Sequence, residues 1–326
     1  MKKISFLVAM FLGLGSALAG QWVVYEGKQG PGTGKHIVLL AGDEEYRSEE
    51  GLPMLGKILS QRHGFKCTVL FSQDPDGTIN PNNSTNVPGM QAVDTADLIV
   101  LQFRFRELPD ADMKHLVDGL KSGKPVIAIR TATHSFQYAH NKNSPYATWD
   151  WRNKEWQGGF GQQVLGDTWV SHHGVHGKES ARGLVNGPYA GHPVLRGVKD
   201  VWGPSDVYGI NRLKPEDTVL LHGLVLKGMK PEDPPNYDKP LMPLVWVRDY
   251  RWDTGKTTRA LTSTIGAAVD LQNEGLRRLF VNACYWLTGL DAPAKADVEL
   301  VGEFKPTYFG FNGFKKGVKV SEHELK

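Results

Sequence analysis

The chain has 326 residues, of which 40% are hydrophobic and 22% charged, as in ordinary globular proteins. Its formal net charge is only +3 and no basic stripe is visible, which argues against nucleic acid and anionic membrane surfaces as partners. The two cysteines, Cys67 and Cys284, fall in separate predicted elements, so we expect packed thiols rather than a metal-type pair.

Residues 1–19 have the pattern of a secretory signal. Two lysines are followed by an apolar run over residues 4–14, and Ala17-Leu18-Ala19 has the small-x-small form that signal peptidase reads. The apolar run is short for a membrane span. We therefore expect a periplasmic or secreted protein that is not stably inserted in a membrane after cleavage.

Strands and helices alternate from residue 36 onward. Buried strands are predicted at residues 36–42, 66–72, 98–103 and 125–130. Helices are predicted from Ser48, as an N-cap, and over 109–121. Later strands are predicted at 219–226, 243–248 and 258–265, before an amphipathic helix at 272–288. This alternation predicts a right-handed, mostly parallel α/β sheet.

The alternation lapses between about residues 136 and 170, where tryptophans and glycines are dense. We interpret this stretch as an aromatic-rich insertion over the sheet edge, with its own small core. At least one of its rings, with Trp156 as the candidate, is expected to form a wall for a sugar. The predicted organisation is an N-terminal arm at 20–35, an α/β domain at 36–290 and an extended tail at 291–326.

Polar residues follow the predicted strands directly. In open α/β sheets, ligands bind beyond the carboxyl ends of the strands. Glu44 and Glu45 follow the first strand, and one of them is predicted to act as a general acid or base. Thr133 and His134 follow the strand at 125–130, where Thr133 could contact a ligand and His134 could shuttle protons.

Arg130 ends the same strand, and a guanidinium there has to be paired or to face a ligand. Glu44 and Asp206 are the candidate partners, and Arg130 is also a candidate for binding substrate. Asp206 and Tyr208 alternate onto one face of an extended segment, which suits sugar hydroxyls or acid–base work. Asp270 and Glu274 follow the last strand and could reach the same edge.

Three histidines crowd the segment Ser171–Gly177, namely His172, His173 and His176. Adjacent His172 and His173 point to opposite faces of an extended chain, so a turn at Gly174 would be needed to bring His173 and His176 together. The sequence therefore predicts no bound metal and no other cofactor. His172 and His173 are expected to contact a ligand by hydrogen bonds, and a metal-dependent hydrolase is kept as an alternative.

Six short motifs occur in an order that resembles the trehalose-utilisation, or ThuA-like, family across residues 36–290. They are Ala128–His134, Gly191–Val194, Asp206–Gly209, Pro243–Arg248, Ile265–Ala267 and Trp286–Gly289. The resemblance implies a three-layer sandwich of flavodoxin-like or class I glutamine amidotransferase-like type. Family members often have histidine where Arg130 stands and Gly-His where Gly266-Ala267 stands, so this chain departs from the pattern at both places.

The resemblance implies carbohydrate metabolism, with a small carbohydrate as the ligand. We expect an exported enzyme that acts on a sugar or keto-sugar derivative by hydrolysis, elimination or isomerisation. It is not expected to be a glutamine amidotransferase, because no cysteine lies in the turn after residue 130. The alternative is a non-catalytic glycan-binding protein, since two missing imidazoles are what a loss of catalysis would leave.

Overall fold

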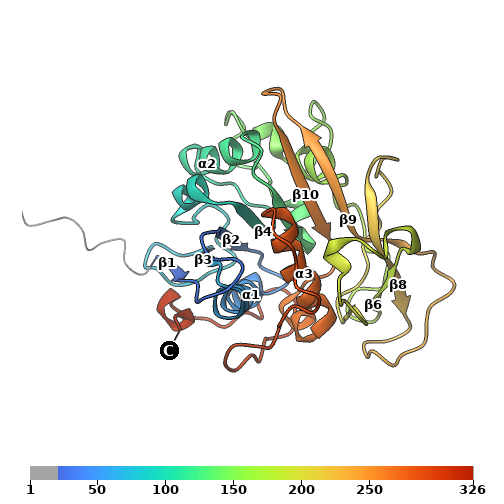
Figure 1. Cartoon of the computed structure of the whole chain (residues 1–326). Helices are drawn as coiled ribbons and strands as arrows, with labels where there is room; N and C mark the ends of the chain where they lie inside the picture. The colour runs from blue at the N-terminus through green and yellow to red at the C-terminus, as the bar shows by residue number, and fades with distance from the viewer. Residues whose placement is uncertain (1–20, 326) are drawn as a thin grey trace, which may run out of the picture.

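A ten-stranded sheet runs through the protein, with helices on both faces (Figure 1). The structure is a computed structural model that describes residues 21–325, so the expected signal sequence lies outside the described residues. The strand order is β1-β3-β2-β4-β5-β10-β9-β8-β6-β7. Among the described residues, no helix is both long and apolar enough to cross a membrane.

The centre of the sheet is parallel, as the alternating pattern predicts. It consists of β3 (Lys66–Phe71), β2 (His36–Gly42), β4 (Leu98–Phe103), β5 (Val126–Ile129) and β10 (Thr257–Ser263). All five coincide closely with strands expected from the sequence. Their carboxyl ends lie at one edge of the sheet, where a ligand site is expected.

Antiparallel strands extend this centre on both sides and make the sheet mixed. β1 (Trp22–Tyr25) pairs with β3 at one edge. At the other edge the order is β9 (Met242–Arg251), β8 (Thr218–Leu226), β6 (Ser180–Val185) and β7 (Trp202–Gly203). β1, β6 and β7 were not expected from the sequence, because they are short and β6 is exposed over its second half.

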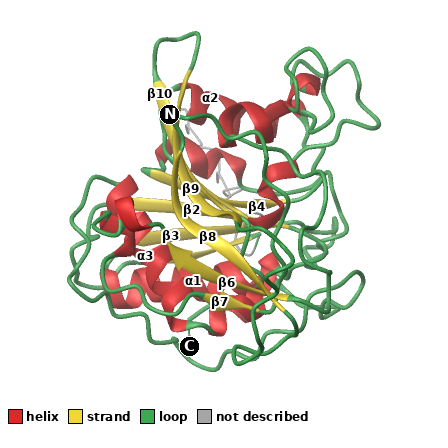
Figure 2. Ribbon diagram, turned by 90° about the vertical axis from the view of Figure 1, so that its right-hand side faces the viewer, coloured by secondary structure: helices red, strands yellow, loops and turns green. Residues whose placement is uncertain are grey.

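The helices divide between the two faces of the sheet. In Figure 2 the strands of the sheet are yellow and the helices red. α1 (Ser48–His63) and α3 (Glu274–Leu287) pack on one face, where Ile37 and Leu39 of β2 join their core. α2 (Asp110–Lys121) packs on the other, with Val38 and Leu40. Successive residues of β2 thus serve opposite cores, which explains why the strand is apolar throughout.

The start of α1 differs in detail from the expected Ser48 cap. Arg47 is the N-cap, in a left-handed conformation with φ of 60°, and Ser48 instead accepts a hydrogen bond from the Asp43 N–H at 3.0 Å. The Arg47 guanidinium donates to the carbonyl oxygen of Gly310 at 2.6 Å. The irregular C-terminal tail is thereby tied to the loop that follows β2.

Glu49, in the first turn of α1, is a buried carboxylate without a partner. The residue is 7% exposed, and neither side-chain oxygen has a hydrogen-bond partner among the described residues. Burial raises the pKa of Glu49 to about 8. The folded protein therefore holds this group protonated at neutral pH, at a cost in stability that grows with pH.

We expect Glu49→Gln to flatten the dependence of stability on pH. Because the folded pKa lies above the unfolded one, the wild-type stability is full below about pH 4 and falls by up to about 1.4 kcal/mol per pH unit until pH passes the folded value. The glutamine of the variant has no carboxyl proton to lose, so its stability lacks this contribution to the pH dependence. Urea unfolding at pH 5, 6, 7 and 8 measures the effect, and equal slopes for both proteins would contradict it.

Candidate functional site

Charged side chains from three neighbouring strands meet at the carboxyl edge of the sheet. Asp43–Glu45 follow β2, Arg104–Arg106 follow β4, and Arg130–His134 form a short 3-10 helix after β5. β2, β4 and β5 are adjacent in the sheet. The chain after β7, which contains Asp206, and the histidine segment lie against the same edge.

Arg130 and Asp206 form a fully buried ion pair at the centre of this edge. Arg130 Nη2 lies 2.8 Å from Asp206 Oδ1, and both side chains have no exposed surface. The guanidinium lies between the rings of Tyr46 and Tyr208, at 4.3 and 4.1 Å from their centroids. It also donates to the backbone carbonyls of Asp206 and Thr264. Arg130 therefore fixes Asp206 and has no surface left for the substrate contact expected from the sequence.

Asp206 in turn holds two imidazoles. Its Oδ2 lies 2.6 Å from His172 Nδ1, and its Oδ1 lies 3.0 Å from His176 Nδ1. Burial would raise the pKa of Asp206, but the Arg130 charge and the hydrogen bonds from His172 and His176 hold it well below the usual range. Asp206 is thus a permanent anion that orients both rings rather than a group that exchanges protons.

The histidine segment reaches Asp206 because its backbone is pinned there. His172 and Tyr208 form an isolated antiparallel bridge, and the N–H of His173 donates to the carbonyl of Val207 at 2.8 Å. A Cβ on Gly174 would lie 3.0 Å from Cβ of Asp206, so the turn needs glycine at this point. The chain does bend at Gly174, but the bend brings His176 beside His172, at 4.9 Å between ring centroids, rather than beside His173.

Glu44 and Glu45 differ sharply in their surroundings. Glu44 forms ion pairs with Arg104 and with Arg106, at 2.9 Å for the latter. The Glu45 carboxylate has only longer contacts, 3.6 Å to Arg104 Nε and 3.4 Å to His176 Nε2. Burial raises the pKa of both groups, and the neighbouring Asp43 adds to the effect in each case. Glu45 is therefore the carboxylate with bonding capacity left for a ligand.

Aromatic rings line the histidines on two sides. Phe309, from the C-terminal tail, packs against Tyr46 at 5.4 Å and against His176 at 5.3 Å between centroids. Trp169 and Tyr208 pack edge-on against His172 at 5.6 and 5.4 Å. The tail is thus part of the site wall, which nothing in its sequence pattern indicated.

His134 and Thr133 lie deeper than the sequence analysis assumed. His134 is 3% exposed and packs against the rings of Trp169 and Tyr208. Burial and the charges of Arg104 and Arg130 lower its pKa well below the usual value, so it stays neutral. Thr133 has no exposed surface, and its Oγ1 lies 3.1 Å from His134 Nδ1. This placement favours structural roles for both residues.

His173 and Trp156 lie apart from the cluster. His173 Nε2 lies 2.8 Å from the carbonyl oxygen of Pro240, in the proline-rich loop. The half-buried ring of Trp156 packs with those of Trp149, Tyr250 and Trp252, and the four rings line a separate cavity of about 260 Å³. Neither side chain belongs to the cluster around Asp206, so the substrate contacts expected of them stay predictions.

Arg104 and Arg106 are site residues that the sequence analysis did not select. They follow the predicted strand at 98–103 directly, and the strand-edge rule applied to Glu44 would have found them. Phe105 and Phe311 flank the Arg104 guanidinium at 4.4 and 4.9 Å, which links the tail to the same edge.

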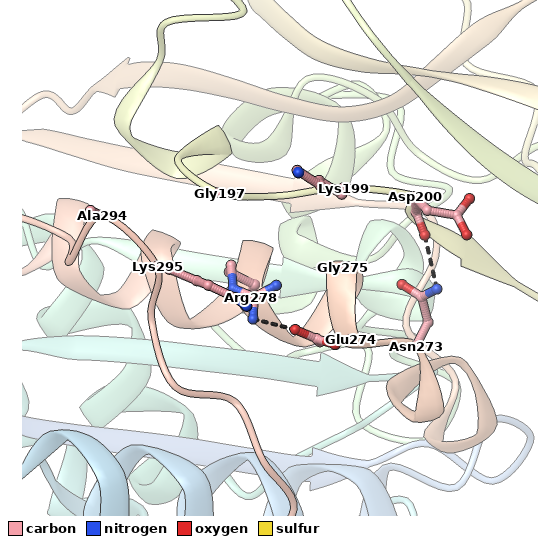
Figure 3. Close-up of a pocket in the computed structure, with 9 residues that line it drawn as sticks. All are labelled: Gly197, Lys199, Asp200, Asn273, Glu274, Gly275, Arg278, Ala294 and Lys295. Carbon is pink, nitrogen blue, oxygen red and sulfur yellow. Dashed lines mark hydrogen bonds and ion pairs between the residues drawn. The ribbon is translucent and has the colours of Figure 1, made fainter.

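Two cavities bear on where a ligand could bind. One of about 260 Å³ is lined by Glu44, Phe105 and Arg106 and opens beside the charged edge. Another of about 600 Å³ lies at the start of α3, where Glu274 pairs with Arg278 (Figure 3). Glu274 therefore belongs to this second cavity, and Asp270 is buried beneath the edge, where it accepts hydrogen bonds from the N–H groups of Gly266 and Ala267.

Comparison with solved structures finds proteins of similar architecture. A ThuA-like protein from Parabacteroides merdae superposes with a TM-score of 0.51 at 14% sequence identity, covering 79% of this chain and 92% of that one. The chain has a ThuA-like fold. A second ThuA-like protein, from Bacteroides uniformis, gives a TM-score of 0.49 at 13% identity and covers 82% and 96% of the two chains. No protein-family profile and no curated protein sequence matches the chain.

Asp206→Asn is expected to destabilise the ThuA-like domain strongly. It would leave the Arg130 charge buried without its counter-ion, and removing one partner of a buried pair costs about 3–5 kcal/mol. Urea unfolding at pH 7 measures the loss. His173→Ala, at a half-exposed neighbour outside the pair, should change the free energy of unfolding by less than about 0.5 kcal/mol. A similar small effect for Asp206→Asn would contradict the central role of the pair.

Proposed function

We propose that this protein is an exported enzyme of carbohydrate metabolism that transfers protons on a small sugar or keto-sugar derivative, with Glu45 as the group that moves the proton. The ThuA-like fold supports the connection with the trehalose-utilisation family. The reaction would be a hydrolysis, an elimination or an isomerisation, each of which needs a general acid or base next to a hydroxyl or carbonyl.

The observation that carries the proposal is the contrast between Glu45 and the other carboxylates of the edge. Asp206 uses both oxygens on Arg130, His172 and His176. Glu44 is committed to two arginines. Glu45 alone among these three makes no side-chain contact shorter than 3.4 Å, and its carboxylate faces the imidazole of His176. A ligand oxygen that approaches Glu45 and His176 from the same side would meet both a proton-transfer group and a hydrogen-bond partner.

The surrounding rings suit a sugar ligand. Sugar faces stack on aromatic side chains, and the half-buried ring of Trp169 packs beside His172, while Tyr208 and Phe309 are buried behind the histidines. Phe311 is 57% exposed beside Arg104 and offers a further apolar surface. A small carbohydrate is therefore a better fit than a phosphorylated ligand at an edge that carries Asp43, Glu44 and Glu45.

We expect Glu45→Gln to lower turnover about 10²–10⁴-fold while leaving the melting temperature nearly unchanged. The assay is product formation from a panel of disaccharides and keto-sugars. Glu44→Gln is the matched comparison: it weakens the pairs with Arg104 and Arg106, so the melting temperature should fall as well.

Full activity of Glu45→Gln would refute the assignment of Glu45. Binding of a sugar in calorimetry without any product after long incubation would instead support the non-catalytic alternative. Export is tested separately by the first residue of the mature chain, which is expected to be Gly20 after cleavage at Ala19.

A further inference from the structure

We infer that His172, His176 and Asp206 form a binding site for a divalent transition-metal ion. Each residue offers one ligand atom, and these atoms all lie within 4.8 Å of one another. The two imidazoles present the same ring nitrogen, Nδ1, to the two oxygens of one carboxylate. The site adds to the proposed function, but it rests on geometry alone and not on the reaction.

An ion would replace the two hydrogen bonds between the imidazoles and Asp206, so these distances of 2.6 and 3.0 Å would open to about 3.3 Å, the spacing of ligand atoms around tetrahedral zinc. Zinc binds imidazole nitrogen and carboxylate oxygen at about 2.0–2.2 Å, so two ligand atoms on one ion lie at most about 4.3 Å apart. The side chains of His172 and His176 are 29% and 36% exposed, so both rings have room to rotate into this arrangement. Asp206 does not need to move, because Arg130 already holds it.

The surroundings of the three residues match the outer shell of a metal site. A histidine that binds a metal through one nitrogen usually donates its other ring N–H to a carboxylate or carbonyl. His176 Nε2 lies 3.4 Å from Glu45 Oε1, on the side of the ring opposite Asp206. The ligating carboxylate is itself held, since Arg130 Nη2 donates to Asp206 Oδ1 at 2.8 Å.

The charge of Arg130 does not block the site. The guanidinium contacts Oδ1, while Oδ2 contacts only His172 among the described residues. The rings of Tyr46 and Tyr208 cover both faces of the guanidinium. Their electron-rich faces stabilise the Arg130 charge where it lies, so an ion on the Oδ2 side remains compatible with it.

Three protein ligands leave at least one coordination position open, the arrangement of catalytic rather than structural zinc sites. A carbonyl or hydroxyl oxygen of the proposed sugar could occupy that position. Two imidazoles with one carboxylate also suit Fe²⁺, Mn²⁺ or Co²⁺, so the ligand set defines a class of ion and not one element.

The test measures binding of Zn²⁺ to the full chain after dialysis against a chelator. Calorimetry and elemental analysis should give one ion per chain. His172→Ala and His176→Ala should each weaken binding by more than about 100-fold, beyond the effect typical of outer-shell changes. His173→Ala is the matched control, because His173 Nε2 contacts the Pro240 carbonyl, and its affinity should stay within a few-fold of wild type.

Absence of binding to the wild type would overturn the inference, and so would equal affinity in all three histidine variants. Loss of binding only in His173→Ala would move the site elsewhere and overturn it too. The assay contains no sugar, so a failure here leaves the assignment of Glu45 standing. If wild-type protein without metal turns over substrate and Glu45→Gln does not, the assignment of Glu45 stands while the metal site fails.

Discussion

The buried pair of Arg130 and Asp206 is the constraint on which the candidate site depends. Buried ion pairs are poor sources of stability, because desolvation offsets most of their attraction. Arg130 also adopts φ of 51°, a conformation uncommon for residues other than glycine. Because the pair contributes little stability and Arg130 has a strained backbone, the role of the pair is to hold two parts of the sheet in place. It joins the parallel centre of the sheet, through the end of β5, to the antiparallel half, through the chain after β7.

The arrangement of the two imidazoles depends on the fixed Asp206 carboxylate. It sets the direction of two imidazoles, and Gly174 allows the turn that brings both rings to it. Glu45 faces them from the loop after β2, which Arg47 ties to Gly310 in the tail. Residues more than 250 positions apart in the sequence therefore share one wall, and the tail must fold back before Phe309 can complete it.

The sequence predicts the parallel centre well, since buried strands such as 36–42 and 98–103 serve two cores and carry an apolar signal throughout. It also predicts that Arg130 pairs with Asp206 as one of two options, from the cost of an unpaired buried charge alone. It does not predict the partner of His176, because that depends on which way a glycine turn folds. Trp156 is a related case: aromatic composition indicates packing and sugar binding equally, and in the fold its ring packs among others while it also lines a cavity that the histidines do not line.

The departures from the family pattern acquire a physical meaning in this arrangement. ThuA-like proteins often carry histidine at the place of Arg130 and after the glycine at 266, and their absence here suggested lost catalysis. Ala267 is instead packed in one cluster with Tyr46 and Phe309, so the space is filled by the ring and the tail. Arg130 recruits Asp206, and Asp206 recruits His172 and His176 from a different segment. Two imidazoles thus stand at the same sheet edge, contributed by a segment other than those that carry histidine in the family pattern.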